Sequence, residues 1–561
     1  MRLLQVAGLI TIAALSSVPA STQDGQAATA TFSSSSELVL VPTVVNDKSG
    51  IHISGLTKQD FVLKQDGKTR SISVFEEVRT DSSRAHRSSG AGGTFSNFDL
   101  ERGVSYRRLS IIVLDFVNTP FADQTSAREA LTKFLLEIAD SGEPICLLAF
   151  SRGGLHVVHD FTEDPKLLAE ALRKVKSTTA PLIPSQNVQA AHPTGGDALG
   201  EMLTRLIRGE LQAESQLASV ERKDAALVTV QGLQQIAKAF RGFPGRKAVI
   251  WASSGFPFSV SPPSSLLCEP ACPTEQRRDV QAAYDNAWKI MNDAQIAVYP
   301  VDLRSADSGI PVASESTFTH PFDIGDPQFD TAAQAKWQRD DTTSTLQLFA
   351  QNTGGRAFLG GNDLAQSFRR AIQDDSSYYM LGYYVSANGT KPGWHPISVA
   401  VHEKGAHARF RNGFFFTTDQ SASSARQEIA LALSSPLDFT GVPVSVTWSG
   451  QDPGKLSGNM RAQFDLVMPA NFASVDESER NHMILDIAVV AKDLNGKIVA
   501  DLSQRIDDHL RPQGLEQVRN HGMTYRNGLQ LPPGNYAVRF VVRDAVGNRM
   551  GSVAVTVRIK L

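Results

Sequence analysis

The sequence predicts an α/β protein whose doubly wound, mostly parallel sheet of the Rossmann type is flanked by two β domains. From residue 106 onward, short apolar runs alternate with segments of helical period, a pattern typical of βαβ units. Before and after this region, short Val-rich runs bounded by turn residues indicate antiparallel strands. A chain of 561 residues also exceeds what one hydrophobic core usually organises, so several domains are expected.

The first 26 residues have the pattern of a signal peptide. Arg2 precedes a short apolar run, and the small residues up to Ala20 form a cleavage site. We therefore expect an exported protein, periplasmic or extracellular, that is cleaved near Ala20. A transmembrane anchor needs about 20 apolar residues, and no later stretch of the sequence approaches this length without charges.

Charge and cysteine content restrict the classes of partner and site. Lys and Arg number 55 against 58 Asp and Glu, so the sequence gives no electrostatic reason to expect nucleic acid. Cys268 and Cys272 lie in a Pro-rich loop and are predicted to form a disulfide, since a zinc site would need two further ligands and no His or other Cys is nearby. Cys146 lies in an apolar run and is predicted to be a buried thiol.

Composition divides the remaining chain into four segments. Residues 37–79 form a small β domain with an Asp66-Gly67 hairpin turn, and residues 80–105 are a Gly- and Ser-rich flexible linker. Residues 106–416 form the α/β domain, interrupted by a long polar excursion near 305–341. Residues 425–561 contain several short strands separated by turns, which favours an immunoglobulin-like β sandwich.

One corner of the α/β domain has the chemistry of a ligand site. The apolar strand Leu109–Asp115 ends in an acid, at the position where parallel sheets present residues to ligands. A hard cation such as Mg²⁺ prefers several oxygen ligands. Asp115 and Thr119 offer oxygens here, Val117 between them does not, and Asn118 is a substitute carbonyl. The alternative is that Asp115 caps the following helix or hydrogen-bonds the neighbouring loops.

The ordered phrases of residues 37–416 resemble a known family. SGLTKQDFVLKQDGK, LDFVNTPFADQ, AVYPVDLRS, NTGGRAF, DDSSYYMLGYY and FRNGFF follow one another in this order. Together they resemble the von Willebrand factor type A (VWA) family, and more narrowly its secreted bacterial group often called acidobacterial-type. The resemblance implies a VWA-like fold for the central domain and a protein-binding role.

The resemblance also implies a metal-ion-dependent adhesion site. Asp115, Thr119 and Thr194 match ligand positions of that site, and a divalent cation such as Mg²⁺ is the implied cofactor. Val117 and Ser254 depart from the family pattern, because the family has a Ser and an Asp at these positions. Losing a carboxylate lowers the charge that attracts a hard cation, so the implied site is a degenerate one.

These observations lead to one expected function and two alternatives. We expect an exported, non-enzymatic adhesion protein that binds a protein partner over the strand ends, through Asp115, Asn118, Thr119, Thr194 and Ser254. The first alternative is a structural envelope or matrix scaffold that binds through its β domains. The second is a hydrolase pairing Ser253 or Ser254 with Asp115, for which the sequence shows no general base.

Overall fold

The structure is a computed structural model that describes most of the chain. The described residues are 36–79, 94–97, 109–137, 144–175, 220–221, 223–256, 274–304, 343–360, 363–374, 376–386, 390–416, 422–454 and 458–560. Several predictions fall outside them: the signal peptide in residues 1–26, the excursion near 305–341, Thr194, and the Cys268–Cys272 disulfide.

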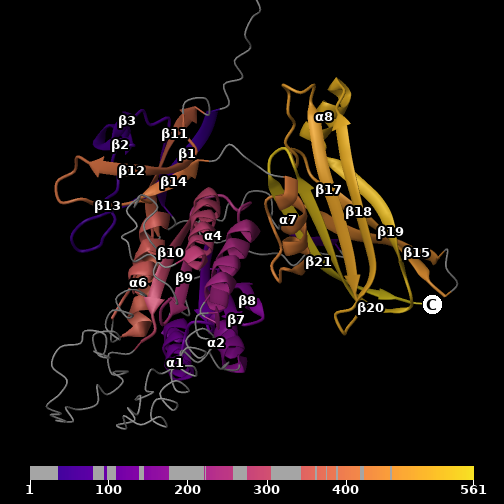
Figure 1. Ribbon diagram of the computed structural model, residues 1–561, viewed down its shortest axis with the longest axis horizontal. Helices are drawn as coiled ribbons and strands as arrows, with labels where there is room; N and C mark the ends of the chain where they lie inside the picture. Colours follow the sequence, from indigo (N-terminus) through magenta and orange to yellow (C-terminus); the bar gives the residue numbers. More distant parts are fainter. Residues whose placement is uncertain are drawn as a thin grey trace, which may run out of the picture.

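The described residues form three structural units (Figure 1). A central unit contains the one sheet with parallel neighbours. An N-terminal unit lies above it in the view of Figure 1, and a C-terminal sandwich lies beside it. The three units together contain five sheets.

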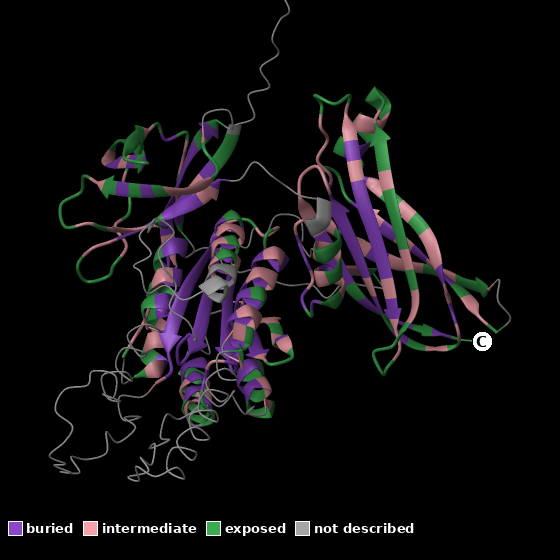
Figure 2. Ribbon diagram, in the orientation of Figure 1, coloured by how far each residue is buried: buried purple, intermediate pink, exposed green. Residues whose placement is uncertain are grey.

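The central unit is built on a five-stranded sheet in the order β10-β9-β6-β7-β8. Four strands are parallel neighbours and β8 pairs antiparallel with β7 at the edge. Figure 2 shows that the parallel strands are buried along their length, as continuous apolar runs require. The strand bounds are β6 (Leu109–Asp115), β7 (Ile145–Ser151), β8 (Gly154–Thr162), β9 (Lys247–Ser253) and β10 (Ile296–Asp302).

Helices pack on this sheet through two hydrophobic clusters. One cluster joins the sheet to α1 (Phe121–Glu137), α2 (Pro165–Lys174) and α6 (Leu364–Asp374). The other joins it to α4 (Thr274–Asp293) and to the helical residues 223–239 and 343–353. Alternate side chains of each strand point to opposite faces, so β6 contributes Ile112 and Leu114 to the first cluster and Ile111 and Val113 to the second.

The N-terminal unit combines two distant parts of the chain. β1 pairs with β11 over eight residues, and β12 pairs with β2. Residues 377–416, which the sequence assigned to the α/β domain, therefore belong with residues 36–79. The sheets are β13-β1-β11-β4 and β14-β12-β2-β3, with β1 (Ser36–Asn46), η1 (Lys58–Asp60), β2 (Phe61–Gln65), β3 (Lys68–Arg70), β4 (Val74–Arg79), β11 (Ser377–Ser386), β12 (Gly393–Val401), β13 (His407–Arg409) and β14 (Gly413–Phe416).

The C-terminal sandwich consists of the antiparallel sheets β19-β16-β15-β5 and β18-β17-β20-β21 around one core. β5 lies in residues 80–105, so the predicted linker contains a strand of this sandwich, which pairs with β15. The elements are β5 (Thr94–Ser96), α7 (Ala422–Ser434), β15 (Ser445–Pro453), β16 (Met460–Met468), β17 (His482–Lys492), β18 (Ile498–His509), α8 (Pro512–Asn520), β19 (Met523–Leu531), β20 (Gly534–Asp544) and β21 (Arg549–Ile559).

The predicted fold class, α/β with a doubly wound and mostly parallel sheet, is wrong for this protein. Its described regular structure is predominantly β, in five mostly antiparallel sheets. The alternation of apolar runs and helices indicates parallel pairing only where a helix returns the chain across the sheet. Strands β11 to β14 follow α6 without further helices between them, and they close antiparallel sheets with the N-terminal strands instead.

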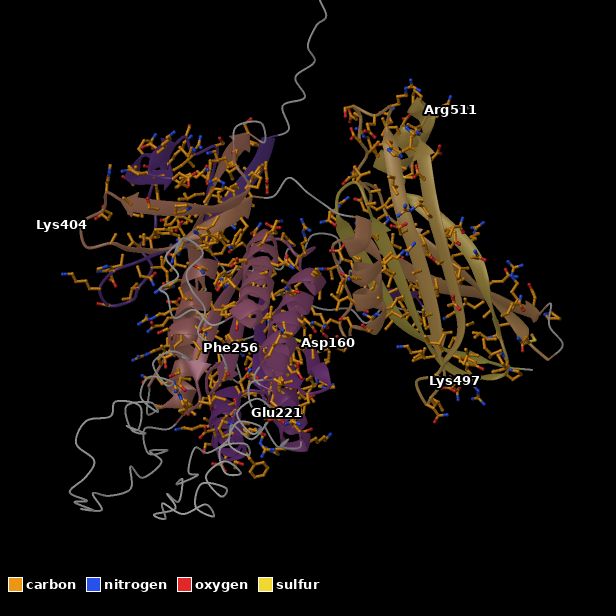
Figure 3. All side chains as sticks on the ribbon, in the orientation of Figure 1. Asp160, Glu221, Phe256, Lys404, Lys497 and Arg511 are labelled. Atoms are coloured by element: carbon orange, nitrogen blue, oxygen red, sulfur yellow. The ribbon has the colours of Figure 1, made fainter. Side chains whose placement is uncertain are left out.

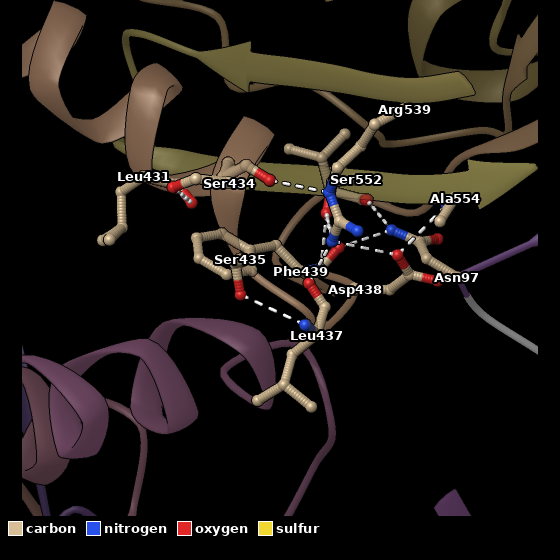
Figure 4. Close-up of polar contacts among 12 residues, drawn as sticks. Asn97, Leu431, Ser434, Ser435, Leu437, Asp438, Phe439, Arg539, Ser552 and Ala554 are labelled. Atoms are coloured by element: carbon tan, nitrogen blue, oxygen red, sulfur yellow. Dashed lines mark hydrogen bonds and ion pairs between the residues drawn. The ribbon is translucent and has the colours of Figure 1, made fainter. Parts of the chain in front are cut away.

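Short polar contacts join the sandwich to the central unit. Thr440 Oγ1 donates to the Ala239 carbonyl at 2.6 Å and accepts from the Gly242 N–H at 3.1 Å. A Cβ at Gly242 would lie 1.8 Å from the Thr440 carbonyl oxygen, so this approach requires glycine. Within the sandwich, Arg539 donates to the Ala432 and Leu437 carbonyls, and Asn97 donates to the Phe439 carbonyl (Figure 4).

Cys146 is a buried thiol in β7, as its apolar surroundings predict. Among the described helices, none has the length and apolar content needed to cross a membrane.

The shared N-terminal unit predicts how fragments of the chain behave. A fragment of residues 36–416 should fold, whereas residues 106–416 should not, because Tyr379, Leu381 and Val399 would lose the core that they share with Val41 and Leu63. Circular dichroism and limited proteolysis of the two purified fragments measure this. A cooperative thermal transition of equal midpoint in both fragments would contradict the pairing.

Candidate functional site

Parallel strands place their carboxyl ends at one edge of the central sheet. Asp115 ends β6, Ser253 ends β9 and Asp302 ends β10, and these three strands are neighbours. Strand register places Asp115 and Ser254 at the same edge, because Leu114 pairs with Ala252.

Asp115 is fully buried and accepts five hydrogen bonds. Oδ1 accepts from the backbone N–H groups of Val117 at 3.1 Å and Asn118 at 3.0 Å, which closes the turn before α1. Oδ2 accepts from Asn118 Nδ2 at 2.8 Å, Trp251 Nε1 at 3.1 Å and Ser253 Oγ at 2.9 Å. The carboxylate therefore holds the β6 corner to the end of β9.

Burial and hydrogen bonding act on the Asp115 pKa in opposite directions. Removal of the carboxylate from water raises the pKa, and the bonds from Asn118, Ser253 and Trp251 lower it. The net direction is upward. A group that is desolvated and surrounded by donors in this way suits a structural role, because any change to it leaves buried donors without an acceptor.

A second set of contacts runs between the corner and the residue after β9. Thr119 is fully buried, and its Oγ1 accepts from the Ser254 N–H at 3.2 Å. Ser254 Oγ donates to Asp123 Oδ2 at 3.1 Å. Asp123 is half-buried in the first turn of α1, and its pKa is raised first by burial and then by the charge of Asp302. The Ser254 hydrogen bond and the Arg304 charge oppose this rise.

Asp302 is committed to an ion pair. Its two carboxylate oxygens accept from Arg304 Nε and Nη2, each at 2.8 Å, in the bidentate geometry of strong pairs. Arg304 Nη2 also donates to Thr343 Oγ1 at 3.0 Å. The Arg304 side chain is 22% exposed, so this guanidinium reaches the surface near Asp123.

The residues present do not fit a divalent metal ion. All five contacts of Asp115 are with N–H or O–H donors, which occupy the lone pairs that a cation would need. Thr119 Oγ1 also receives a donor, and Thr194 lies outside the described residues. No group of three or more His, Cys, Asp or Glu side chains with metal-site geometry occurs in the part of the chain that the structure describes.

Two members of the corner were missed by the sequence argument because they lie far from it in the chain. Thr229, in the helical residues 223–239, accepts from Asn118 Nδ2 at 2.8 Å. Trp251 lies inside β9, where it reads as an ordinary apolar core residue; its indole N–H nevertheless reaches Asp115. Asp123 could have been identified from the sequence, because an acid in the first turn of the helix after β6 lies close to the same strand ends.

A serine and a histidine come together in the β7–β8 hairpin. Ser151 Oγ lies 2.6 Å from His156 Nε2 across the β7–β8 hairpin. His156 is exposed, and no described acid contacts its other nitrogen, so the pair lacks the third group that orients a catalytic imidazole. Of the two serines that the hydrolase alternative pairs with Asp115, Ser253 does contact it, with Oγ donating to Oδ2 at 2.9 Å, whereas Ser254 Oγ donates to Asp123 instead.

An exposed aromatic ring borders the corner. Phe121, the first residue of α1, is 58% exposed, and no other described phenylalanine is an exposed large hydrophobic residue. Phe256 differs sharply from it: this ring is buried and packs edge-on against Trp251 at 5.7 Å between centroids. The buried side of the corner is thus filled by aromatic packing, while Phe121 faces solvent.

Comparison with known proteins gives little further information. No family model matches the chain, and no curated protein matches it. Two similar solved structures are a glycosyl hydrolase family 2 member from Bacteroides cellulosilyticus DSM 14838 and a β-glucuronidase from Bacteroides uniformis. Each is 11% identical over 34% of this chain, with a TM-score of 0.15, and the alignments span 21% and 20% of those proteins. A likeness of this size supports no argument about function.

The Asp115 network predicts unequal effects of two substitutions. Asp115→Ala should lower the free energy of unfolding by about 3 kcal/mol, because it leaves buried donors such as Trp251 Nε1 unsatisfied. Asp123→Ala should cost only about 1 kcal/mol, since it removes one hydrogen bond at a half-buried site. Urea unfolding measures both values, and hydrogen exchange of residues 109–120 and 247–256 locates the change. Equal losses would rule out the organising role of Asp115.

The raised pKa of Asp123 predicts a pH dependence with a defined sign. The folded-state pKa lies above the unfolded value of about 3.9, so the folded protein binds this proton more tightly. Wild-type stability should therefore fall relative to Asp123→Asn as the pH rises from the unfolded pKa through the folded one. Urea unfolding at a series of pH values measures the difference. Parallel curves for the two proteins would contradict the shift.

Proposed function

We propose that the protein is a non-catalytic binding protein whose partner is another protein, docked on the carboxyl edge of the central sheet. The observation that supports this most directly is Phe121, an exposed aromatic ring at the start of the helix that also carries the half-buried Asp123. Aromatic and arginine side chains dominate the energy of protein interfaces. The proposal keeps the binding role that the resemblance to the VWA family implies.

The proposed contact residues differ from those that the sequence selected. Asp115 and Thr119 are fully buried, so neither can touch a partner in this conformation. Asn118 is half-buried, and Phe121 and Pro120 are exposed on the same turn. In the proposed complex the partner contacts this turn, while Asp115 acts beneath it as a positioning residue.

A rigid corner favours binding. Holding the turn by several hydrogen bonds before the partner arrives reduces the conformational entropy that association must overcome. The Asp115 and Thr119 contacts fix the turn and the first residues of α1, and Gln124 Nε2 donates to the Thr119 carbonyl at 2.8 Å. The backbone from which the Phe121 side chain projects is therefore fixed by hydrogen bonds.

The proposal predicts a large effect of Phe121→Ala. A photo-reactive phenylalanine analogue at position 121 of the exported chain first identifies the partner by cross-linking and mass spectrometry. The affinity of the purified partner for Phe121→Ala should then fall about thirtyfold, the effect of losing an interface hot spot of about 2 kcal/mol. Isothermal titration calorimetry measures it.

Leu136→Ala is the matched control. Leu136 is an exposed apolar residue, at 49%, near the other end of the same helix. Its substitution should leave the affinity unchanged. Equal weakening by both variants, or no cross-link from position 121, would favour the scaffold alternative over the proposed site.

A further inference from the structure

A cavity lies at the junction of the N-terminal and central units. Its volume is about 650 Å³, within the range of about 300 to 1,000 Å³ typical of small-molecule sites. The walls come from the end of β1 and the turn after it, from β13, from the last turn of α6 and from the segment around Arg356. It shares no residue with the carboxyl-edge site.

Strand register directs two basic side chains toward the same side. In the β1–β13 pair, Val44 faces Arg409 and Asn46 faces His407. Residues two apart in a strand point to one face, so His407 and Arg409 lie together, and both line the cavity. Figure 1 shows β13 close to the upper end of α6.

The α6 wall has a matching periodicity. Arg370 and Asp374 are four residues apart and therefore lie on one face of the helix. Asp374 accepts from Arg409 Nη2, which ties the helix to β13 across the cavity. This ion pair holds the Arg409 guanidinium in place. Because Asp374 is engaged by Arg409, Arg370 on the same helix face has no ion pair with it.

The cavity lining is cationic although the chain is not. The lining contains four cationic side chains and two carboxylates: Lys48, Arg356, Arg370 and Arg409 against Asp47 and Asp374. Positive charge is therefore in excess even if His407 is neutral, whereas the whole chain has a net charge of −3. Asp47 is also engaged in its own turn, because Oδ1 accepts from the Ser49 and Ile51 N–H groups at 2.8 and 3.0 Å.

Several of these cations have spare donors. Arg356 and Arg370 make no ion pair or hydrogen bond with another described residue; Arg356 instead lies over the Phe358 ring, 5.4 Å from its centroid. Arg409 Nε is buried and has no acceptor among the described residues. A buried donor without an acceptor is costly unless a ligand or water satisfies it.

We propose that this cavity binds a small polyanion through Arg356, Arg370 and Arg409. The ligand class is a small molecule with at least two oxyanion groups, phosphate, sulfate or carboxylate. Arginine forks bind such groups in a bidentate manner, and guanidinium groups on separate walls require more than one of them. The size of the cavity excludes a folded macromolecule from its interior.

The test uses the full exported chain and three probes: pyrophosphate, a disulfated disaccharide and citrate. At least one should bind saturably in calorimetry and raise the melting temperature as occupancy grows. The probe that binds identifies the source of the oxyanion. Arg356→Gln/Arg370→Gln should weaken binding by about tenfold or more, the effect of losing charge-assisted hydrogen bonds.

The double control removes two charges outside the cavity. Arg369→Gln/Lys404→Gln alters the neighbouring helix residue, which pairs with Glu137, and a lysine at the tip of the β12–β13 connection (Figure 3). This variant should bind as the wild type does. Binding of none of the three probes, or equal weakening in the control, would overturn the proposal, and neither result bears on capture of a protein partner at Phe121.

Discussion

The buried carboxylate of Asp115 is the constraint on which the carboxyl edge of the central sheet depends. An acid with no exposure to water must be surrounded by donors. Here the donors come from its own turn, from Asn118, and from Trp251 and Ser253 of the neighbouring strand. The hydrogen bonds that satisfy the Asp115 carboxylate thus fix the path of the turn, the start of α1 and the register of β6 against β9.

This constraint changes the role of the residue that the sequence brought forward. An acid at the end of a parallel strand is at a ligand-presenting position, but its oxygens are available only if no protein donor occupies them. The turn that Asp115 holds presents Pro120 and Phe121 outward instead. Residues that build a site and residues that contact a ligand are therefore different here.

The return of the chain after α6 governs the rest of the molecule. β11 pairs with β1, so the N-terminal unit encloses residues from both sides of the central unit. The fully buried Arg246, directly before β9, strengthens this junction: its backbone N–H donates to Tyr378 Oη of β11 at 3.0 Å, and its Nη1 donates to the Pro42 carbonyl of β1 at 3.5 Å. The same return places Arg409 opposite α6 and so creates the cationic cavity.

The sequence by itself determined the local elements and the polar corner. Leu109–Asp115 and Ile296–Asp302 read as buried strands because their apolar runs are continuous, and the structure has strands with these bounds. Only the tertiary structure decided which strands pair, since antiparallel partners such as β1 and β11 lie more than 300 residues apart and pairing leaves no local pattern. For the same reason, the donors from Trp251 and Thr229 and the cluster of Arg356, Arg370 and Arg409 could not be read from the sequence: each depends on segments that meet only after folding.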